Sequence, residues 1–152
     1  MLAVTYVLEG DLDRLRIPTQ QPARFADRLW QHTCFEIFIR AEGATSAYHE
    51  FNFSPSREWA AYAFERYREG APLTDESLDP QVAVSNDAAK LELSASIRLG
   101  ALSLLHSRAK LTLALSAVVE DNDGSLSYWA LAHPAGKPDF HHPDGFALEL
   151  QA

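Results

Sequence analysis

Two short stretches of this 152-residue chain carry side chains that can hold a ligand by hydrogen bonds. Glu36 and Arg40 lie in the first stretch, and Glu50 and Asn52 lie in the second. Carboxylates and amides bond hydroxyl groups in defined geometries, and an indole ring beside them offers an apolar face. We therefore predict a binding surface that includes Trp30, Glu36, Arg40, Tyr48, Glu50 and Asn52.

The spacing of these residues predicts two neighbouring strands, because apolar and polar side chains alternate with a period of two. One set of positions is expected to face the core: Phe35, Ile37, Ile39, His49, Phe51 and Phe53. The other set then shares the opposite face: Cys34, Glu36, Phe38, Arg40, Tyr48, Glu50, Asn52 and Ser54. This second face fits either an ordinary solvated surface with cross-strand salt bridges or a platform that binds a ligand.

The three tryptophans are expected to have different roles. A Trp in a β-sandwich is more often part of the core than a ligand contact. Trp30 is the exception that we favour, because it stands at the start of a strand, where loops open. Trp129 is in phase with Leu131, which favours a place in the core and makes a ligand contact the weaker alternative.

The segment 132–145 contains three histidines and two aspartates, which are common metal ligands. Its spacing matches no standard metal motif, and adjacent His141 and His142 cannot easily point the same way in an extended chain. We predict a Pro-kinked surface loop and no metal site. Asp121 and Asp123 resemble part of a calcium loop but lack the closing Glu, so a hairpin turn explains them better.

The chain has no nucleophile elbow, phosphate loop, dinucleotide fingerprint or zinc-protease helix. Glu36 and Glu50 can in principle form the acid and base pair of a glycosidase. Sugar-binding modules use the same residue types without catalysis, so we expect a protein that is not an enzyme.

The remaining pattern predicts an all-β fold. Short strands are expected at 4–8, 12–17, 29–40, 48–54, 58–68, 82–84, 91–97, 111–120, 126–132 and 146–150. A surface loop is expected at 70–80 and a helical turn at 99–105. Regularly spaced short strands with little helix favour an antiparallel β-sandwich of the immunoglobulin or jelly-roll kind.

Bulk properties exclude several classes of partner. The chain has 13 Lys plus Arg against 21 Asp plus Glu, a formal net charge of −8, and no basic run, which argues against nucleic acid or an anionic membrane. Cys34 is the single cysteine and is expected to be a small buried hydrophobe. No membrane-length apolar stretch or secretory signal is seen, so a reduced cytoplasmic setting fits. The oligomeric state stays open.

Several motifs together resemble the DOMON-like domains. They are Leu29-Trp30, the stretch 33–39, the stretch 50–55 with Trp59-Ala-Ala-Tyr62, the stretch 127–131 and Gly145-Phe-Ala-Leu148. The resemblance runs from about Leu8 to Leu150. This superfamily of antiparallel β-sandwiches also holds the family 9 carbohydrate-binding modules and certain cytochrome domains. Related chains begin about one strand earlier, so the resemblance implies a single domain over residues 1–152 that lacks a first strand.

The resemblance also implies a site. In the sugar-binding relatives, a Trp six residues ahead of a Glu forms one wall around a sugar, as Trp30 and Glu36 can do here. A second aromatic wall falls to Trp129 or Phe140. The relatives' paired aspartates between Trp and Glu are replaced by His32 and Thr33.

We therefore expect a saccharide-binding module without a cofactor. The alternatives are a haem-binding or redox-partner domain and an interaction module with no small ligand. The haem-binding relatives usually use an axial Met, and the only Met here is Met1, so Met/His ligation is not expected, while ligation by histidines alone stays open.

Overall fold

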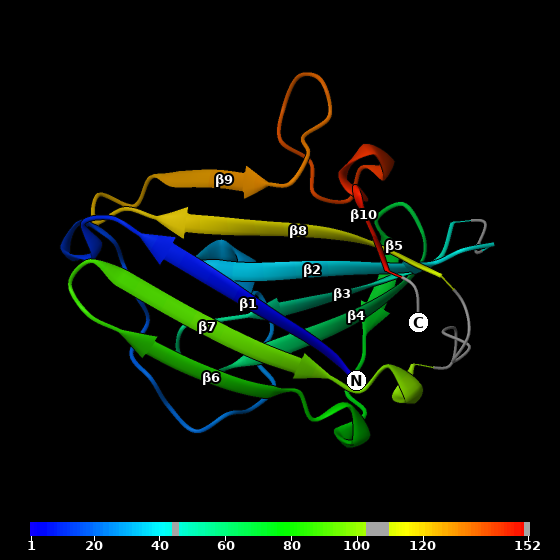
Figure 1. Ribbon diagram of the computed structural model, residues 1–152, viewed down its shortest axis with the longest axis horizontal. Coiled ribbons are helices and arrows are strands. Elements are labelled where there is room, and N and C mark those ends of the chain that lie inside the picture. The colour runs from blue at the N-terminus through cyan, green and yellow to red at the C-terminus, as the bar shows by residue number, and fades with distance from the viewer. Residues whose placement is uncertain (44–45, 103–109, 151–152) are drawn as a thin grey trace.

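The computed structural model describes residues 1–43, 46–102 and 110–150, and these residues form two antiparallel sheets (Figure 1). The smaller sheet has the strand order β1-β7-β6, with β1 at Leu2–Glu9, β7 at Lys90–Ile97 and β6 at Gln81–Asn86. The larger sheet has the order β10-β8-β2-β3-β4-β5, with β9 also paired to β8. Its strands are β2 (Cys34–Ala41), β3 (Tyr48–Phe53), β4 (Trp59–Arg66), β5 (Glu69–Pro72), β8 (Leu111–Glu120), β9 (Leu126–Ala130) and β10 (Leu148–Leu150). The predicted all-β antiparallel sandwich is confirmed.

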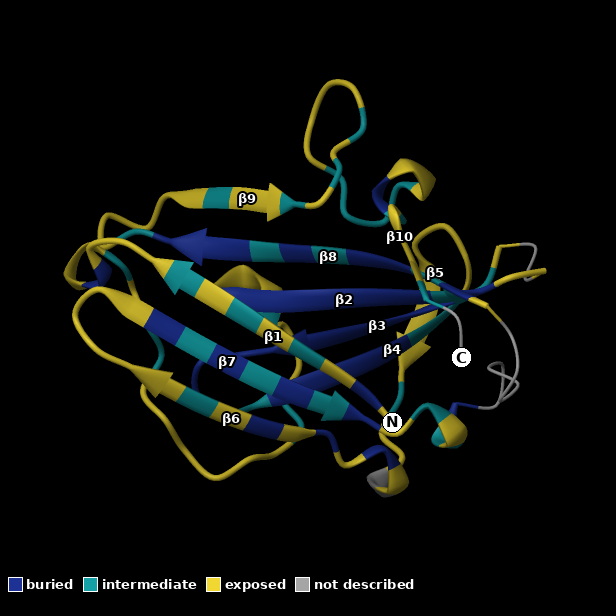
Figure 2. Cartoon of the chain, viewed as in Figure 1, coloured by how far each residue is buried: buried dark blue, intermediate teal, exposed yellow. Residues whose placement is uncertain are grey.

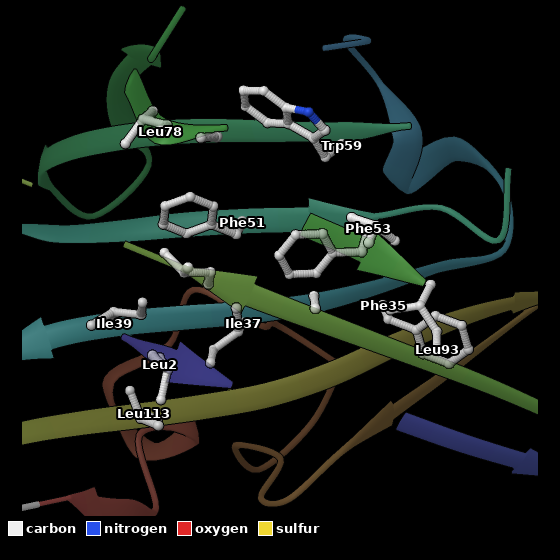
Figure 3. Packing of buried hydrophobic residues seen from close by; sticks show 14 of the residues in the cluster. Leu2, Phe35, Ile37, Ile39, Phe51, Phe53, Trp59, Leu78, Leu93 and Leu113 are labelled. Carbon is white, nitrogen blue, oxygen red and sulfur yellow. The ribbon is translucent and has the colours of Figure 1, made fainter. Parts of the chain in front are cut away.

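The core lies between the two sheets and is built by the alternation that the sequence predicts. Phe35, Ile37 and Ile39 of β2 and Phe51 and Phe53 of β3 belong to one buried apolar cluster (Figure 3). The small sheet covers them with residues of one face of β7, namely Leu91, Leu93, Ala95 and Ile97. Burying one such large side chain is worth about 1.5–3 kcal/mol, so this cluster holds the two sheets together. Cys34 is fully buried, as expected.

The opposite face of the large sheet is not an ordinary solvated surface. Nearly every residue of β2 and β3 is buried, whichever face it occupies (Figure 2). Glu36 is 3% exposed, Glu50 is 5% exposed and Asn52 is fully buried. The solvated alternative is therefore wrong. The chain that runs from β9 to β10 lies over part of this face.

Several predicted strands are confirmed with somewhat different bounds: β4 and β9 are shorter than predicted, whereas β1, β6 and β7 are longer. Residues 58–68 contain β4, and the hairpins β6–β7 and β8–β9 lie where turn residues were recognised. Gly124 in the β8–β9 turn has a φ of +86°, a conformation that favours glycine over residues with a Cβ.

Three predicted elements are wrong at least in part. Residues 12–17 do not form a strand: Leu12–Arg14 is a 3₁₀ turn, and the spacing of three from Leu12 to Leu15 lets both side chains contact the core. Residues 29–31 are also a 3₁₀ turn, so the strand predicted from residue 29 begins only at Cys34. The predicted loop 70–80 starts inside the edge strand β5, where Pro72 is tolerated because edge positions need not donate to a partner.

The helical turn predicted at 99–105 is a 3₁₀ turn at Leu99–Ala101, and residues 103–105 lie outside the described residues. Other 3₁₀ turns lie at Glu76–Leu78 and Pro143–Gly145. In the part of the chain that the structure describes, no helix is long and apolar enough to cross a membrane.

Candidate ligand-binding pocket

A pocket of about 350 Å³ lies on the polar face of the large sheet. Strands β2, β3 and β4 supply one side of it, and residues 138–141 between β9 and β10 supply the other. Its lining residues are Trp30, Glu36, Glu50, Tyr62, Phe64, Arg68, Val118, Tyr128, Pro138, Asp139, Phe140 and His141.

The strand register places the two buried carboxyl groups next to each other. Glu36 pairs with Asn52, and Glu50 pairs with Phe38 on the same strand as Glu36. Glu36 and Glu50 are thus diagonal neighbours on one face, a relation that sets residues about 7–8 Å apart. Both carboxyls line the pocket.

Of the two carboxyls, Glu36 has the environment that opposes ionisation more strongly. Burial raises its pKa well above the ordinary value of 4.5, the neighbouring Glu50 raises it further, and Arg68 opposes the rise. Among the described residues, no side chain donates a hydrogen bond to its carboxyl oxygens. Burial and the neighbouring Glu50 therefore both oppose ionisation of Glu36, and its carboxyl oxygens remain available to a ligand.

Glu50 is held by neighbours on both sides. Asn52 Nδ2 donates to Glu50 Oε1 at 2.8 Å, and His141 Nε2 lies 3.6 Å from Glu50 Oε2. Burial raises the pKa of Glu50 to about 7, against the opposing effects of the Asn52 hydrogen bond and the Arg68 charge. This carboxyl changes its charge close to neutral pH.

His141 closes the pocket over this carboxyl and is neutral there. Burial lowers its pKa to about 4, and the charge of Arg68 contributes in the same direction. Its Nδ1 lies 2.8 Å from Tyr48 Oη, which also accepts a hydrogen bond from the Arg68 backbone N–H at 3.1 Å. The imidazole packs edge-on against the rings of Phe38 and Phe64, each 5.1 Å between centroids.

Residues 131–147 connect β9 to β10 and are called the covering segment below. Asp139 ties this segment to Tyr67 and Arg68 in the turn after β4. Its Oδ1 accepts a hydrogen bond from Arg68 Nη2 at 2.8 Å and another from the His141 backbone N–H at 3.1 Å. Its Oδ2 accepts a hydrogen bond from the Tyr67 hydroxyl. Although burial acts to raise the pKa of Asp139, the bonds from Tyr67 and Arg68 lower it overall, so this carboxyl stays ionised and binds the Arg68 guanidinium.

Asp139→Asn is expected to loosen residues 138–142 at a cost of about 1 kcal/mol, because the ion pair with Arg68 is partly exposed and so is weaker than a buried one. Hydrogen exchange of the amides in this segment should become faster, and urea unfolding should give the stability change. Asp144→Asn, in the same segment but 70% exposed, is the matched control. Exchange that stays as slow as in the unaltered protein would show that aromatic packing alone holds the segment.

Aromatic rings form much of the remaining wall. Trp30 contacts Tyr62 edge-on at 5.8 Å, and Tyr128 contacts Phe140 edge-on at 5.9 Å. Tyr62 Oη donates to Asp27 Oδ1 at 2.5 Å, which fixes that ring. Trp30 is 40% exposed, so one side of the indole is open to a ligand.

Phe64 depends on a glycine beside it. A Cβ on Gly70, its partner across β4 and β5, would collide with the Ala63 carbonyl oxygen and the Phe64 ring. Gly70 therefore leaves room for the Phe64 ring, which stacks on Tyr48 at 4.7 Å.

Two buried polar atoms flank Glu36 without a hydrogen-bond partner within the described structure. They are Asn52 Oδ1 and Ser116 Oγ, on the residues that pair with Glu36 from β3 and from β8. Such orphaned atoms are uncommon in folded proteins and call for an explanation. Here they lie on either side of a carboxyl group that reaches the pocket.

The structure brings together only part of the predicted site. Trp30, Glu36, Glu50 and Phe140 line the pocket, while Tyr48 and Asn52 lie behind it and bond the lining residues. Arg40 lies elsewhere: its guanidinium packs over the Phe146 ring at 4.4 Å, and its Nε donates to Thr112 Oγ1.

Trp129 does not line the pocket, and the expectation that it belongs to the core is wrong. Its side chain is 63% exposed, and Leu131, in phase with it, is 56% exposed. Trp129 pairs with Ala117 in the row that continues the core face, but β9 is an edge strand that pairs only with β8. Alternation gives the face of a strand correctly, and it cannot tell whether the other sheet extends far enough to cover that face.

Tyr62, Phe64, Arg68, Tyr128 and His141 were not predicted as site residues. For Tyr62 a signal exists, since pairing β4 with β3 places it beside Glu50 on the same face. The segment 132–145 was interpreted as a surface loop, whereas residues 138–141 form a wall of the pocket. In the described parts of the chain, no three His, Cys, Asp or Glu side chains are grouped to hold a metal ion.

No protein-family model matches the chain, and no curated protein matches it in sequence. One solved structure is similar in fold, a protein from Bacteroides uniformis ATCC 8492 that is provisionally named carbohydrate-binding. The match has a TM-score of 0.69 at 14% sequence identity and covers 95% of this chain and 70% of the other. At this identity the likeness concerns the fold alone: the chain shares its β-sandwich with that protein.

Proposed function

We propose that this protein binds a small hydroxylated ligand, a saccharide, in the pocket on its large sheet, and that it does so without catalysis. The observation that carries the proposal is the position of Glu36, whose buried carboxyl lines the pocket and, among the described residues, accepts no side-chain hydrogen bond. Ligand hydroxyl groups both donate and accept, so they suit the adjacent Glu36 and Glu50 carboxyls that line the pocket.

Size and wall chemistry support the same conclusion. A volume of about 350 Å³ is at the small end of the range for ligand pockets, which suits one or two rings. The open side of Trp30 offers an apolar surface to a sugar ring, while Glu36 and Glu50 accept hydrogen bonds from its hydroxyl groups. The resemblance to DOMON-like domains and the name of the B. uniformis protein agree with this choice.

The haem-binding alternative gains no support from the described residues. Nδ1 of His141, the one histidine that lines the pocket, already lies against Tyr48, and its Nε2 faces Glu50. Neither nitrogen is free to ligate iron without breaking this arrangement.

Trp30→Ala is expected to weaken saccharide binding about tenfold or more, because it removes the ring on which the sugar stacks. Isothermal titration calorimetry with glucose, galactose, cellobiose and maltose measures the change. Trp129→Ala is the control, since its exposed side chain should alter stability by no more than about 0.5 kcal/mol and leave affinity unchanged. Equal loss in both variants would remove Trp30 from the site, and cleavage of a disaccharide would contradict the absence of catalysis.

A further inference from the structure

The charges around the pocket do not balance. Its described lining residues include three carboxyl groups, those of Glu36, Glu50 and Asp139, and one cationic side chain, that of Arg68. Arg68 is engaged by Asp139, and its Nε also donates to Tyr67 Oη. His141 adds no positive charge at neutral pH, because burial keeps its pKa low. Glu36 and Glu50 are left without a cation of their own.

Two adjacent buried carboxyls are costly to ionise when no cation lies beside them. Removing an ionised carboxylate from water costs several kcal/mol unless a partner compensates it, and two such groups side by side repel each other. A protein that only needs hydroxyl acceptors can use amide or carbonyl oxygens at far lower cost. A positive charge placed between the two carboxyls would compensate both.

The walls around these carboxyls also suit a cation. The lining residues include five aromatic rings, those of Trp30, Tyr62, Phe64, Tyr128 and Phe140. The face of an aromatic ring attracts an ammonium group within about 6 Å, and this attraction strengthens when the cation is desolvated. The formal net charge of −8 also favours the approach of cationic over anionic ligands.

We propose that the pocket selects a ligand that carries an ammonium group, namely an amino sugar, with the ammonium between Glu36 and Glu50 and against the aromatic wall. This inference rests on the proposed function, because it names the class of saccharide that the same pocket takes. A neutral sugar would offer hydrogen bonds to Glu36 and Glu50 but no positive charge to compensate them when they ionise.

The test compares ligands that differ at one position, where an ammonium group replaces a hydroxyl group. Three matched pairs are titrated at pH 7: glucosamine and glucose, galactosamine and galactose, and mannosamine and mannose. Tetramethylammonium serves as a cation without hydroxyl groups. In at least one pair the amino sugar is expected to bind about tenfold or more tightly than its neutral parent.

Charge-removing variants locate the effect. Glu36→Gln and Glu50→Gln keep the shape of the side chain and are each expected to reduce the preference for the amino sugar about tenfold. Their effect on any neutral sugar should be smaller. Glu65→Gln removes the same charge from an exposed position on β4 and should leave the preference unchanged.

Each outcome separates this inference from the proposed function. Equal affinities within every pair would overturn the selection of ammonium and leave saccharide binding in place. Binding of tetramethylammonium without binding of any sugar would overturn saccharide binding and retain the cation site. No binding of any probe at millimolar concentration would overturn both.

Discussion

Glu50→Gln is expected to raise the free energy of unfolding by about 2–3 kcal/mol at pH 8. A rise of the Glu50 pKa from 4.5 to about 7 means that the fold disfavours the ionised carboxylate. One pKa unit corresponds to about 1.4 kcal/mol, so the full shift is worth up to ~3 kcal/mol. Gln is neutral, and its side-chain oxygen can still accept the hydrogen bond from Asn52 Nδ2.

The effect has a defined pH window. The folded chain keeps a proton on Glu50 up to about pH 7, whereas the unfolded chain releases it near pH 4.5. The contribution of Glu50 to stability is therefore fully present below pH 4.5 and is lost as the pH rises through 7. His141 acts in the opposite sense, because its folded pKa of about 4 lies below the unfolded value of 6.5. Its contribution grows between pH 4 and 6.5 and offsets most of the decline due to Glu50, so only the comparison with the Glu50→Gln variant isolates that decline.

Urea unfolding at pH 4.5, 6.5 and 8 measures this difference. The Glu50→Gln variant should match the unaltered protein at pH 4.5 and exceed it at pH 8, with a melting temperature higher by roughly 5–10 °C. Glu65→Gln controls for the loss of one negative charge, and its stability relative to the unaltered protein should not change in this way between pH 4.5 and 8. A Glu50→Gln variant that is less stable at pH 8 would show that the ionised carboxylate has a stabilising partner in the fold.

Phe38→Ala is expected to cost about 3–5 kcal/mol, as much as a substitution in the main core. Phe38 is fully buried but belongs to a second apolar cluster with Tyr48 and Ala114, on the pocket face of the sheet. Phe146 and Phe140, from the chain that follows β9, pack against this cluster. The substitution would leave a cavity under the covering segment.

Phe51→Ala provides the matched comparison, because Phe51 is equally buried but lies between the two sheets. Similar losses in the two variants, measured by urea unfolding, would show that the covering segment packs as firmly as the small sheet. A loss below about 1 kcal/mol for Phe38→Ala alone would show that the segment opens or collapses at little cost, and the pocket would then lack a fixed wall.

The sequence is sufficient to predict the sandwich and the orientation of the two central strands. The alternation around Glu36 and Glu50 assigns each side chain to the correct face, because successive side chains of a strand point to opposite faces of the sheet. The alternation does not reveal that this face is covered, because the cover depends on whether the residues near His141, far along the chain, pack against the sheet. Aromatic and histidine side chains in a Pro-rich segment look the same in sequence whether they dock or stay solvated.

Trp129 shows the opposite case, in which a side chain predicted to be buried is exposed. Its phase with Leu131 correctly indicates one face of a strand, but its burial depends on the width of the opposing sheet. Arg40 lies on the predicted face, yet it is two same-face positions from Glu36 along β2, does not line the pocket, and packs on Phe146 instead. The face of the sheet on which a side chain lies is set by the local chain, whereas the extent of a pocket is set by long-range packing.

The contact between Tyr48 and His141 joins residues 93 positions apart in the chain. During synthesis the floor of the pocket is therefore made long before its covering segment leaves the ribosome. Until those residues dock, one wall of the pocket is missing, and Glu36 and Glu50 are more open to water. The cost of dehydrating them falls in part on the docking of the segment between β9 and β10, because Phe140 and His141 line the pocket beside them. A ligand that compensates these carboxyls would favour that step, so it would act on the maturation of the chain as well as on the finished fold.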